Sequence, residues 1–231
     1  LLDARPRRIP IYLYDNADIA VDPRNRSVWY LAKGSGGLWK TTNRGSSWEA
    51  IFDEGGSYSL GCVTIDPRHS AVIWLGTGEN SSNRSVGYGD GVYKSTDGGD
   101  NWTEISAGLP SDFGYAICVS RADPDTVFQI PESSSHMRTT VDGRLRVYRS
   151  RDGGAHWTAL ETGLPQKHAY VTVLREALDS DANDPRGVYF GTSSGHVFAS
   201  RDEGDQWQLA ASYLPRILSV KAHLARPGDL I

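Results

Sequence analysis

The sequence predicts an all-β protein built from repeated four-stranded antiparallel units. The chain of 231 residues contains 25 Gly, 11 Tyr and 7 Trp but only 1 Met, which is typical of short strands and tight turns. No stretch keeps a helical apolar period over several turns, so we expect no long amphipathic helix. One short motif recurs four times at nearly constant spacing, which indicates a repeat architecture.

The repeated motif has the pattern Ser/Thr-x-Asp/Asn-x-Gly-x-x-Trp. Its copies end at Trp48, Trp102, Trp157 and Trp207, which lie 54, 55 and 50 residues apart. Asx and hydroxyl side chains bind nearby backbone amides and Gly accepts a positive φ, so each copy predicts a tight turn with a structural rather than catalytic Asp or Asn. The other motif positions are Thr41, Asn43 and Gly45; Ser95, Asp97 and Gly99; Ser150, Asp152 and Gly154; and Ser200, Asp202 and Gly204.

Four strands are expected around each motif. A β-branched first strand precedes an Asp-Pro turn at residues 19–23, 63–67 and 118–124. Second strands are expected at 28–32, 72–76, 126–130 and 188–192, third strands at 37–40, 91–94, 145–148 and 196–199, and fourth strands start at the motif Trp. Residues 173–182, which could form a short helix by propensity, are interpreted as a strand running into a loop.

Four short strands per unit of roughly fifty residues is the period of a β-propeller blade. We therefore predict one β-propeller domain over residues 1–231, with blades at about 18–51, 61–106, 115–160 and 170–210 and a closing strand at about 217–223. No motif follows that last strand. Because unpaired edge strands are a liability, either this strand closes the ring against the N-terminal region, or the chain belongs to a larger propeller, or copies self-associate.

The motifs resemble the Asp-box (BNR) repeats of sialidases, sortilin-type receptors, xyloglucanases and photosystem II assembly propellers. Residues 74–80 and 89–99 are especially similar to sortilin-like bacterial propellers with glycosyl hydrolase labels, and the resemblance extends from about residue 18 to residue 223. It implies the propeller fold and an extracytoplasmic or secreted location. It implies little about activity, because this fold carries many functions.

The composition excludes several function classes. With 24 Lys+Arg and 28 Asp+Glu, the net charge of −4 argues against a nucleic-acid partner. No apolar run is long enough to span a membrane. Cys62 and Cys118 are expected at equivalent first-strand positions as buried free thiols, and the histidines show no metal-ligand spacing, so we predict no metal and no cofactor.

Two long loops at the ends of the blades opposite the motif turns carry the candidate site. They cover residues 78–90 and 131–144, and loops on a rigid scaffold commonly bind ligands. Glu79 and Glu132, which we place at equivalent positions, are the candidate carboxyl pair for glycoside hydrolysis, although both could be solvated loop acids. The candidate ligand-binding residues are Arg84, Tyr88, Asp90, His136 and Arg138, together with Arg8 of an Arg-Ile-Pro segment that matches the sialidase pattern.

Aromatic side chains near these loops provide a second candidate surface, since aromatic faces bind sugar rings and peptide anchors alike. They are Tyr58, Tyr88, Phe113, Tyr115 and Tyr170, of which Tyr115 and Tyr170 are expected to be core or channel residues.

Three functions stay open. The first is a non-catalytic propeller that binds a glycan or protein through its loop face. The second is a glycoside hydrolase that uses Glu79 and Glu132, or an incomplete sialidase-like site with Arg8, Arg84 and Arg138. The third is a structural module of a larger assembly.

Overall fold

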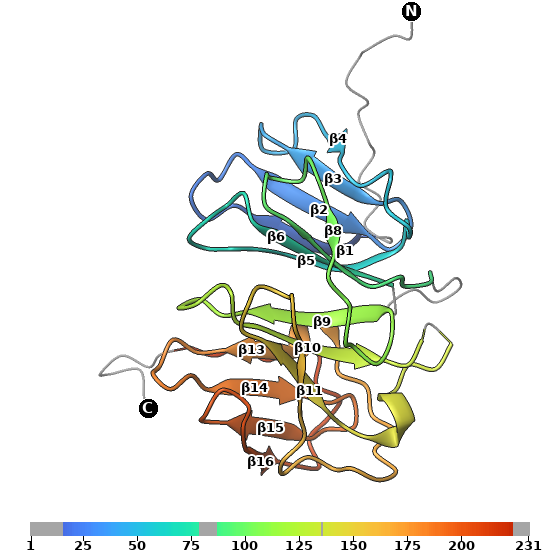
Figure 1. Cartoon of the computed structure of the whole chain (residues 1–231), viewed down its shortest axis with the longest axis vertical. Helices are drawn as coiled ribbons and strands as arrows, with labels where there is room; N and C mark the ends of the chain where they lie inside the picture. The colour runs from blue at the N-terminus through green and yellow to red at the C-terminus, as the bar shows by residue number, and fades with distance from the viewer. Residues whose placement is uncertain (1–15, 79–86, 135, 224–231) are drawn as a thin grey trace, which may run out of the picture. The chain divides into compact units, whose positions relative to one another are not determined.

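The computed structural model describes residues 16–78, 87–134 and 136–223. Within these ranges, sixteen strands form four antiparallel sheets of four strands, each sheet in sequence order (Figure 1). The predicted all-β class with four-stranded antiparallel blades is therefore confirmed.

The first two sheets are consecutive in the chain. The first contains β1 (Asn16–Val21), β2 (Trp29–Lys33), β3 (Leu38–Thr41) and β4 (Glu49–Ala50). The second contains β5 (Leu60–Ile65), β6 (Ile73–Thr77), β7 (Val92–Ser95) and β8 (Thr103–Glu104).

The last two sheets repeat this order. The third contains β9 (Phe113–Val119), β10 (Val127–Glu132), β11 (Val147–Ser150) and β12 (Thr158–Leu160). The fourth contains β13 (Leu178–Ser180), β14 (Val188–Gly191), β15 (Val197–Ser200) and β16 (Trp207–Ala211). Two short 3-10 helices, η1 (Val141–Gly143) and η2 (Arg175–Ala177), lie in connections.

Strand pairing gives the four sheets a common register. The first residue of every motif lies opposite the same position of the second strand, in the pairs Thr41 with Trp29, Ser95 with Ile73, Ser150 with Val127, and Ser200 with Val188. Equivalent residues of the four sheets can therefore be assigned without ambiguity near the motif.

The chain divides into two compact units. Unit 1 comprises residues 1–106, 111–115 and 134–137, and unit 2 comprises residues 107–110, 116–133 and 138–231. Unit 1 thus holds the first two sheets and the start of β9, while unit 2 holds the rest of the third sheet and the fourth. The prediction that the whole chain is one domain stays a prediction.

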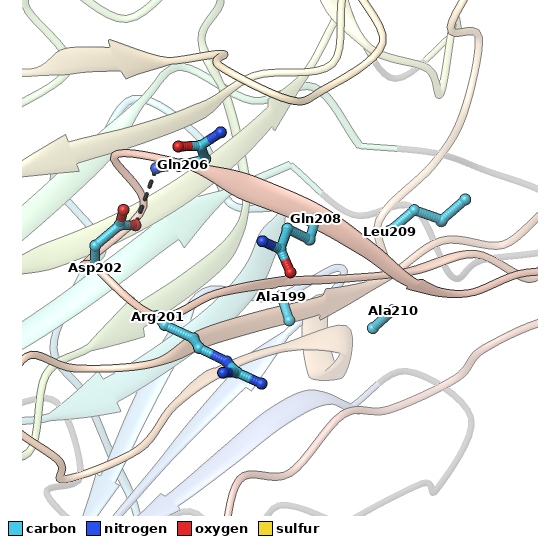
Figure 2. Close-up of a pocket in the computed structure, with 7 residues that line it drawn as sticks. All are labelled: Ala199, Arg201, Asp202, Gln206, Gln208, Leu209 and Ala210. Atoms are coloured by element: carbon cyan, nitrogen blue, oxygen red, sulfur yellow. Dashed lines mark hydrogen bonds between the residues drawn. The ribbon is translucent and has the colours of Figure 1, made fainter.

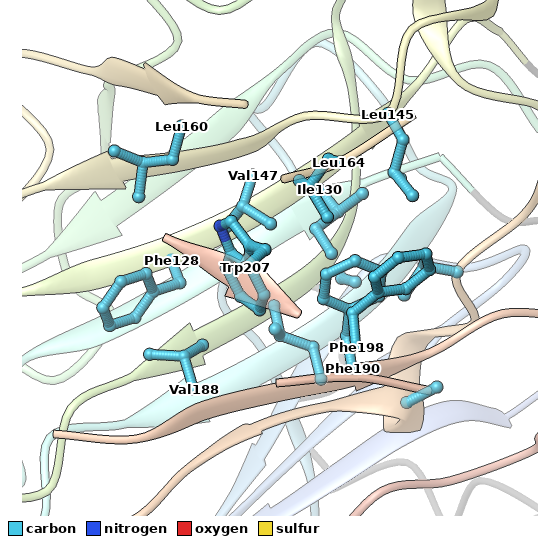
Figure 3. Close-up of a cluster of buried hydrophobic side chains, with 14 of the residues drawn as sticks. Phe128, Ile130, Leu145, Val147, Leu160, Leu164, Val188, Phe190, Phe198 and Trp207 are labelled. Carbon is cyan, nitrogen blue, oxygen red and sulfur yellow. The ribbon is translucent and has the colours of Figure 1, made fainter. Parts of the chain in front are cut away.

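Each unit has its own apolar core between its two sheets. In unit 1, Tyr30 and Leu38 of the first sheet pack with Ile73 and Leu75 of the second. In unit 2, Phe128 of the third sheet belongs to the same cluster as Phe190, Phe198 and Trp207 of the fourth (Figure 3). The ring centroid of Phe190 lies 5.1 Å from that of Phe198 and 5.0 Å from that of Trp207, so the fourth sheet contributes a packed aromatic group to this core.

The motif copies form turns with a shared set of hydrogen bonds. In the second sheet, the Ser95 hydroxyl donates to Asp97 Oδ1 at 2.8 Å and accepts from the Gly99 N–H at 2.9 Å. Asp97 Oδ1 also accepts from the N–H of Asn101 at 2.9 Å. The same three bonds recur in the other three copies. The Asp or Asn of each copy is therefore occupied in holding its own turn.

Two sequence expectations differ from the structure here. Residues 173–182 do not start as a strand, because the 3-10 helix η2 precedes β13. The expected closing strand at 217–223 is not part of any sheet, although Ile217 and Val220 pack against the unit 2 core.

The cysteines are free and buried, but they do not occupy equivalent positions. The N–H groups of Asp66 and Ser120 close the same turn, by bonding to Val72 and Thr126. Cys62 lies four residues before Asp66, whereas Cys118 lies two residues before Ser120, so the two thiols differ in register by two residues. No helix in the described ranges is long and apolar enough to cross a bilayer.

Candidate functional site

The loop side of unit 1 carries a compact cluster that we call the tyrosine platform, made of Gly56, Ser57, Tyr58, Tyr88 and Asp90. Residues 56–58 precede β5, and residues 88–90 end the long connection from β6 to β7. The Ser57 hydroxyl donates to the carbonyl of Tyr88 at 2.6 Å, so the two segments are tied together. Because each motif turn joins the third and fourth strands, this cluster lies at the opposite end of its sheet.

The two tyrosine rings of the platform are exposed and mutually fixed. Tyr58 is 57 % exposed and Tyr88 is 50 % exposed. Their centroids lie 6.2 Å apart with an interplanar angle of 88°, an edge-to-face pair. The Tyr88 hydroxyl donates to the carbonyl of Gly56, and the Tyr58 carbonyl accepts from the N–H of Gly37 at 2.9 Å. Two large aromatic faces are thus presented to solvent on a backbone that is held from both sides.

Asp90 supports the platform from within the sheet. Its N–H donates to Thr77 Oγ1 at 2.8 Å, and its Oδ2 accepts from the Tyr93 hydroxyl at 2.9 Å. Burial, and then the hydrogen bond to Asp90, raise the pKa of Tyr93 to about 12. Tyr93 therefore remains a hydrogen-bond donor to this carboxylate at neutral pH.

Gly56 is required by the close packing of the platform against Asp90. A Cβ atom at Gly56 would lie 1.8 Å from Asp90 Oδ2 and 3.5 Å from the Tyr93 hydroxyl. The backbone of Gly56 can approach the carboxylate only because it carries no side chain.

In unit 2, Glu132 does not lie in a solvated loop. It is the last residue of β10, is 2 % exposed and forms a β-bridge with Thr140. The alternative that Glu132 is a solvated loop acid is therefore wrong. Glu79 lies outside the described residues, so the equivalence of the two glutamates and their role as a carboxyl pair stay predictions.

Tyr170 is a second exposed aromatic residue, on the loop side of unit 2. It is 62 % exposed, so it is not a core residue, while the alternative that it lines a channel stays a prediction. Its ring lies against Gly143, where a Cβ would be 3.0 Å from Tyr170 Cε1, and the ring of His168 lies 6.4 Å away. Phe113, by contrast, is buried.

The structure places the remaining candidates as follows. Tyr88 and Asp90 come together in unit 1, where both contact Gly56. His136 is exposed in unit 1, whereas Arg138 lies in unit 2, where its carbonyl accepts from the Thr172 hydroxyl. Arg8, Glu79 and Arg84 lie outside the described residues, as do the loop positions around them.

Sequence reasoning missed the residues that fix the platform. Gly56, Ser57 and Tyr93 carry no recognisable motif. The roles of Gly56 and Ser57 depend on contacts across 31 to 34 residues of chain, whereas Tyr93 acts on Asp90, which is close in sequence. The segment Gly55-Gly56-Ser57-Tyr58-Ser59 was the available signal, since small residues around an aromatic ring allow close backbone approach. Among the described residues, no group of three His, Cys, Asp or Glu side chains could hold a metal ion.

Comparison with known proteins gives consistent results for the fold. No family model matches the chain. A xyloglucanase, Xgh74A, from Acetivibrio thermocellus is 26 % identical over 231 aligned residues, which cover 84 % of this chain and 26 % of that protein. The chain therefore spans about a quarter of the length of that curated relative.

Solved structures show the same architecture. An ancestral GH74 enzyme superimposes with a TM-score of 0.65 at 21 % identity, over 86 % of this chain and 24 % of the other. YCF48 from Cyanidioschyzon merolae superimposes with a TM-score of 0.56 at 17 % identity, over 87 % of this chain and 58 % of the other. The four sheets of this chain thus share the fold of a GH74 enzyme and of YCF48.

Proposed function

We propose that this chain is the glycan-recognising part of a propeller of the glycoside hydrolase type, and that it binds a xyloglucan-like β-glucan on the tyrosine platform. The observation that carries the proposal is the exposed and fixed pair of Tyr58 and Tyr88. Aromatic faces stack on the apolar faces of sugar rings, and a pair that is already ordered loses little conformational entropy on binding.

The comparisons support a neutral polysaccharide as the ligand. The curated relatives of this chain are named xyloglucanases rather than sialidases. A neutral glucan has no carboxylate for an arginine clamp to hold, so the tyrosine rings are better suited to it than Arg8, Arg84 and Arg138. Because polymers of this kind do not cross membranes unaided, the same ligand supports the proposed extracytoplasmic location.

The test is the affinity of the chain for xyloglucan oligosaccharides, measured by isothermal titration calorimetry. Tyr58→Ala and Tyr88→Ala should each weaken binding about tenfold or more, because each removes one aromatic face. Tyr213→Ala is the matched control, since Tyr213 is also strongly exposed but lies in the segment after β16. An equal loss in all three variants, or no binding by the parent chain, would reject the platform.

Hydrolysis is the second candidate function, and the xyloglucanase relatives favour it. Glycoside hydrolysis needs an acid and a base or nucleophile on either side of the scissile bond. Glu79 and Glu132 stay the proposed pair. Release of reducing sugar from xyloglucan that is lost in Glu79→Gln and in Glu132→Gln would support them. Release that survives in both variants would keep the activity and reject these residues.

A further inference from the structure

Two segments on the loop side of unit 2 are joined into an ordered frame. One is residues 138–143, in the connection from β10 to β11, and the other is residues 169–172, in the link between β12 and β13. The N–H of Ala169 donates to the carbonyl of Gly143 at 2.9 Å, and the Thr140 hydroxyl donates to the carbonyl of Ala169. The frame therefore holds the side chains that project from it in fixed positions.

Tyr170 projects from this frame into solvent. It is 62 % exposed, although its neighbour Ala169 is buried. Its ring packs on Gly143, where a Cβ would lie 3.0 Å from Tyr170 Cε1 and 3.3 Å from the hydroxyl oxygen. Tyr58 lies in the corresponding link of unit 1, between β4 and β5. Each unit thus presents an exposed tyrosine from the link between its two sheets.

Asp142 and His168 add polar side chains beside this tyrosine. Both are exposed, and within the described ranges neither side chain has an ion pair or a hydrogen bond. The ring centroid of His168 lies 6.4 Å from that of Tyr170, and Asp142 directly precedes Gly143.

The backbone at both polar residues is left-handed, with φ values of 58° at Asp142 and 54° at His168. This conformation is unfavourable for a residue with a side chain, and it concentrates at binding sites where the surrounding structure enforces it. Outside the motif turns, Tyr213 is the other described residue with a side chain in this conformation. Two of the three such residues therefore lie beside Tyr170.

An exposed aromatic ring with a free carboxylate and an imidazole beside it suits a neutral sugar residue. The apolar face of the sugar stacks on the tyrosine, while its hydroxyl groups donate to the carboxylate and bond to the imidazole. Asp142 would repel an anionic ligand, and an apolar ligand would bury this carboxylate without a partner. A cationic ligand would use Asp142 and the ring but not the imidazole, whereas a sugar uses all three groups.

We propose that Tyr170, Asp142 and His168 form a second sugar-binding site, in unit 2, for a neutral glucan. The inference rests on the proposed function for the class of sugar, but its residues are separate from the tyrosine platform. Because the site has one aromatic ring where the platform has two, it should bind an oligosaccharide more weakly than the platform does. One chain then binds two oligosaccharide molecules, one in each unit.

The hollow beside β15 and β16 lacks an aromatic ring and supplies a control (Figure 2). It has a volume of about 290 Å³, and its lining includes Ala199, Arg201, Gln206, Gln208 and Leu209. The amide and guanidinium groups can form hydrogen bonds, but none of the lining residues offers a ring on which a sugar could stack. Gln208→Ala should therefore leave sugar binding unchanged.

The test is equilibrium dialysis of the chain against a labelled xyloglucan oligosaccharide, which counts the molecules bound per chain at saturation. The parent chain and Gln208→Ala should bind two. Tyr170→Ala should bind one, with the affinity of the platform unchanged, and Tyr58→Ala/Tyr88→Ala should bind one with the weaker affinity. The triple variant should bind none, whereas Tyr170→Phe, which keeps the ring, should bind two.

A further variant separates recognition from folding. Glycine accepts the left-handed backbone of Asp142 without strain, so Asp142→Gly should unfold at the same or a higher urea concentration than the parent. Its affinity at the weaker site should nevertheless fall about tenfold, because the charged hydrogen-bond acceptor is lost. An unchanged affinity at that site would overturn the proposed set of residues.

The count of bound molecules also separates this site from the platform. A parent chain that binds one molecule, lost in Tyr58→Ala/Tyr88→Ala and kept in Tyr170→Ala, would overturn the second site and leave the platform intact. One molecule that is lost in Tyr170→Ala alone would support the second site and reject the platform. Binding of none by the parent chain would overturn both.

Discussion

The backbone N–H of Trp207 donates to the carbonyl of Thr162 at 2.9 Å, which ties the fourth strand of one sheet to the connection that leaves the preceding sheet. Gly163 follows this contact in a Gly-Leu-Pro sequence that also occurs at residues 108–110. The two glycines have similar positive φ values, 88° at Gly163 and 96° at Gly108. Their surroundings differ, since a Cβ at Gly163 would lie 2.1 Å from the Trp207 carbonyl oxygen and a Cβ at Gly108 would meet nothing within 4 Å.

This pair of glycines separates backbone strain from steric conflict. Gly108→Ala should destabilise the fold by about 1–2 kcal/mol, which is the cost of a left-handed conformation for an L-residue. Gly163→Ala should cost about 1–3 kcal/mol more, because its methyl group meets backbone that cannot turn aside. Urea unfolding of both variants measures the difference. Equal losses of unfolding free energy in the two variants would show that the backbone at Trp207 moves away from the added methyl group without an energetic penalty.

The hydrogen bond that Lys40 Nζ donates to the Gly98 carbonyl should contribute measurably to stability. Lys40→Met keeps the aliphatic stem and removes the charged donor, so we expect a loss of about 1–3 kcal/mol in the free energy of unfolding of unit 1. Lys167→Met, at an exposed position, is the control and should change stability by less than about 0.5 kcal/mol. If the Lys40 variant is as stable as the control, water satisfies the Gly98 carbonyl as well as Lys40 does, and this hydrogen bond does not stabilise the fold.

Asp97 should make the fold sensitive to acid. Hydrogen bonds from the Asn101 side chain, the Asn101 N–H and Ser95 lower its pKa from 3.8 to about 2. A carboxyl group whose pKa is lowered by folding stabilises the folded state at pH values above its pKa in the unfolded chain. This contribution is lost as the pH falls from about 4 towards 2. Asp97→Asn reproduces the Asn43 of the first motif and does not titrate.

The measurement is urea unfolding between pH 5 and pH 2. The parent should lose more stability over this range than Asp97→Asn, while Asp53→Asn, an exposed acid outside the motifs, should leave the slope unchanged. A parallel loss in the parent and in Asp97→Asn would assign the acid sensitivity to other carboxyl groups.

The repeat made the fold predictable from sequence, whereas the site was predictable only in part. The motif residues at Ser95, Asp97 and Gly99 interact within five positions of chain, so their spacing carries the turn geometry directly. Glu132 shows the limit of that reasoning. It follows the expected second strand at 126–130 and was placed in the loop that starts at Pro131, whereas β10 continues to Glu132 and buries its side chain.

The tyrosine platform also depends on contacts that the sequence did not reveal. Tyr88 was identifiable as an aromatic residue in a long loop, but the contacts that hold it come from Gly56 and Ser57, which precede another strand. The small residues around Tyr58 indicate that some backbone approaches closely, but a single sequence does not say which segment approaches. Tyr170 was expected to be a core or channel residue because it stands near an expected strand start, yet the 3-10 helix η2 comes first and β13 begins only at Leu178.

The contact between Gly56 and Asp90 leads to a prediction about the platform itself. Gly56 does not have a positive φ, so Gly56→Ala introduces no backbone strain and acts only through its methyl group against Asp90 Oδ2. The segment that carries Tyr58 must then move, and we expect xyloglucan oligosaccharide affinity to fall about tenfold, together with a loss of about 1–3 kcal/mol in stability.

Shortening the partner tests whether this contact is the cause. In a Gly56→Ala/Asp90→Ser double variant the methyl group gains room, because serine lacks the Oδ2 atom that also accepts the hydrogen bond from Tyr93. The double variant should therefore recover most of the affinity that Gly56→Ala loses, and Asp90→Ser alone should lose little, since Asp90 acts beneath the rings rather than on the ligand. If the affinity lost by the double variant equals the sum of the losses of the two single variants, Gly56 and Asp90 act independently. The geometry of the platform would then depend on Ser57 and Tyr88 alone.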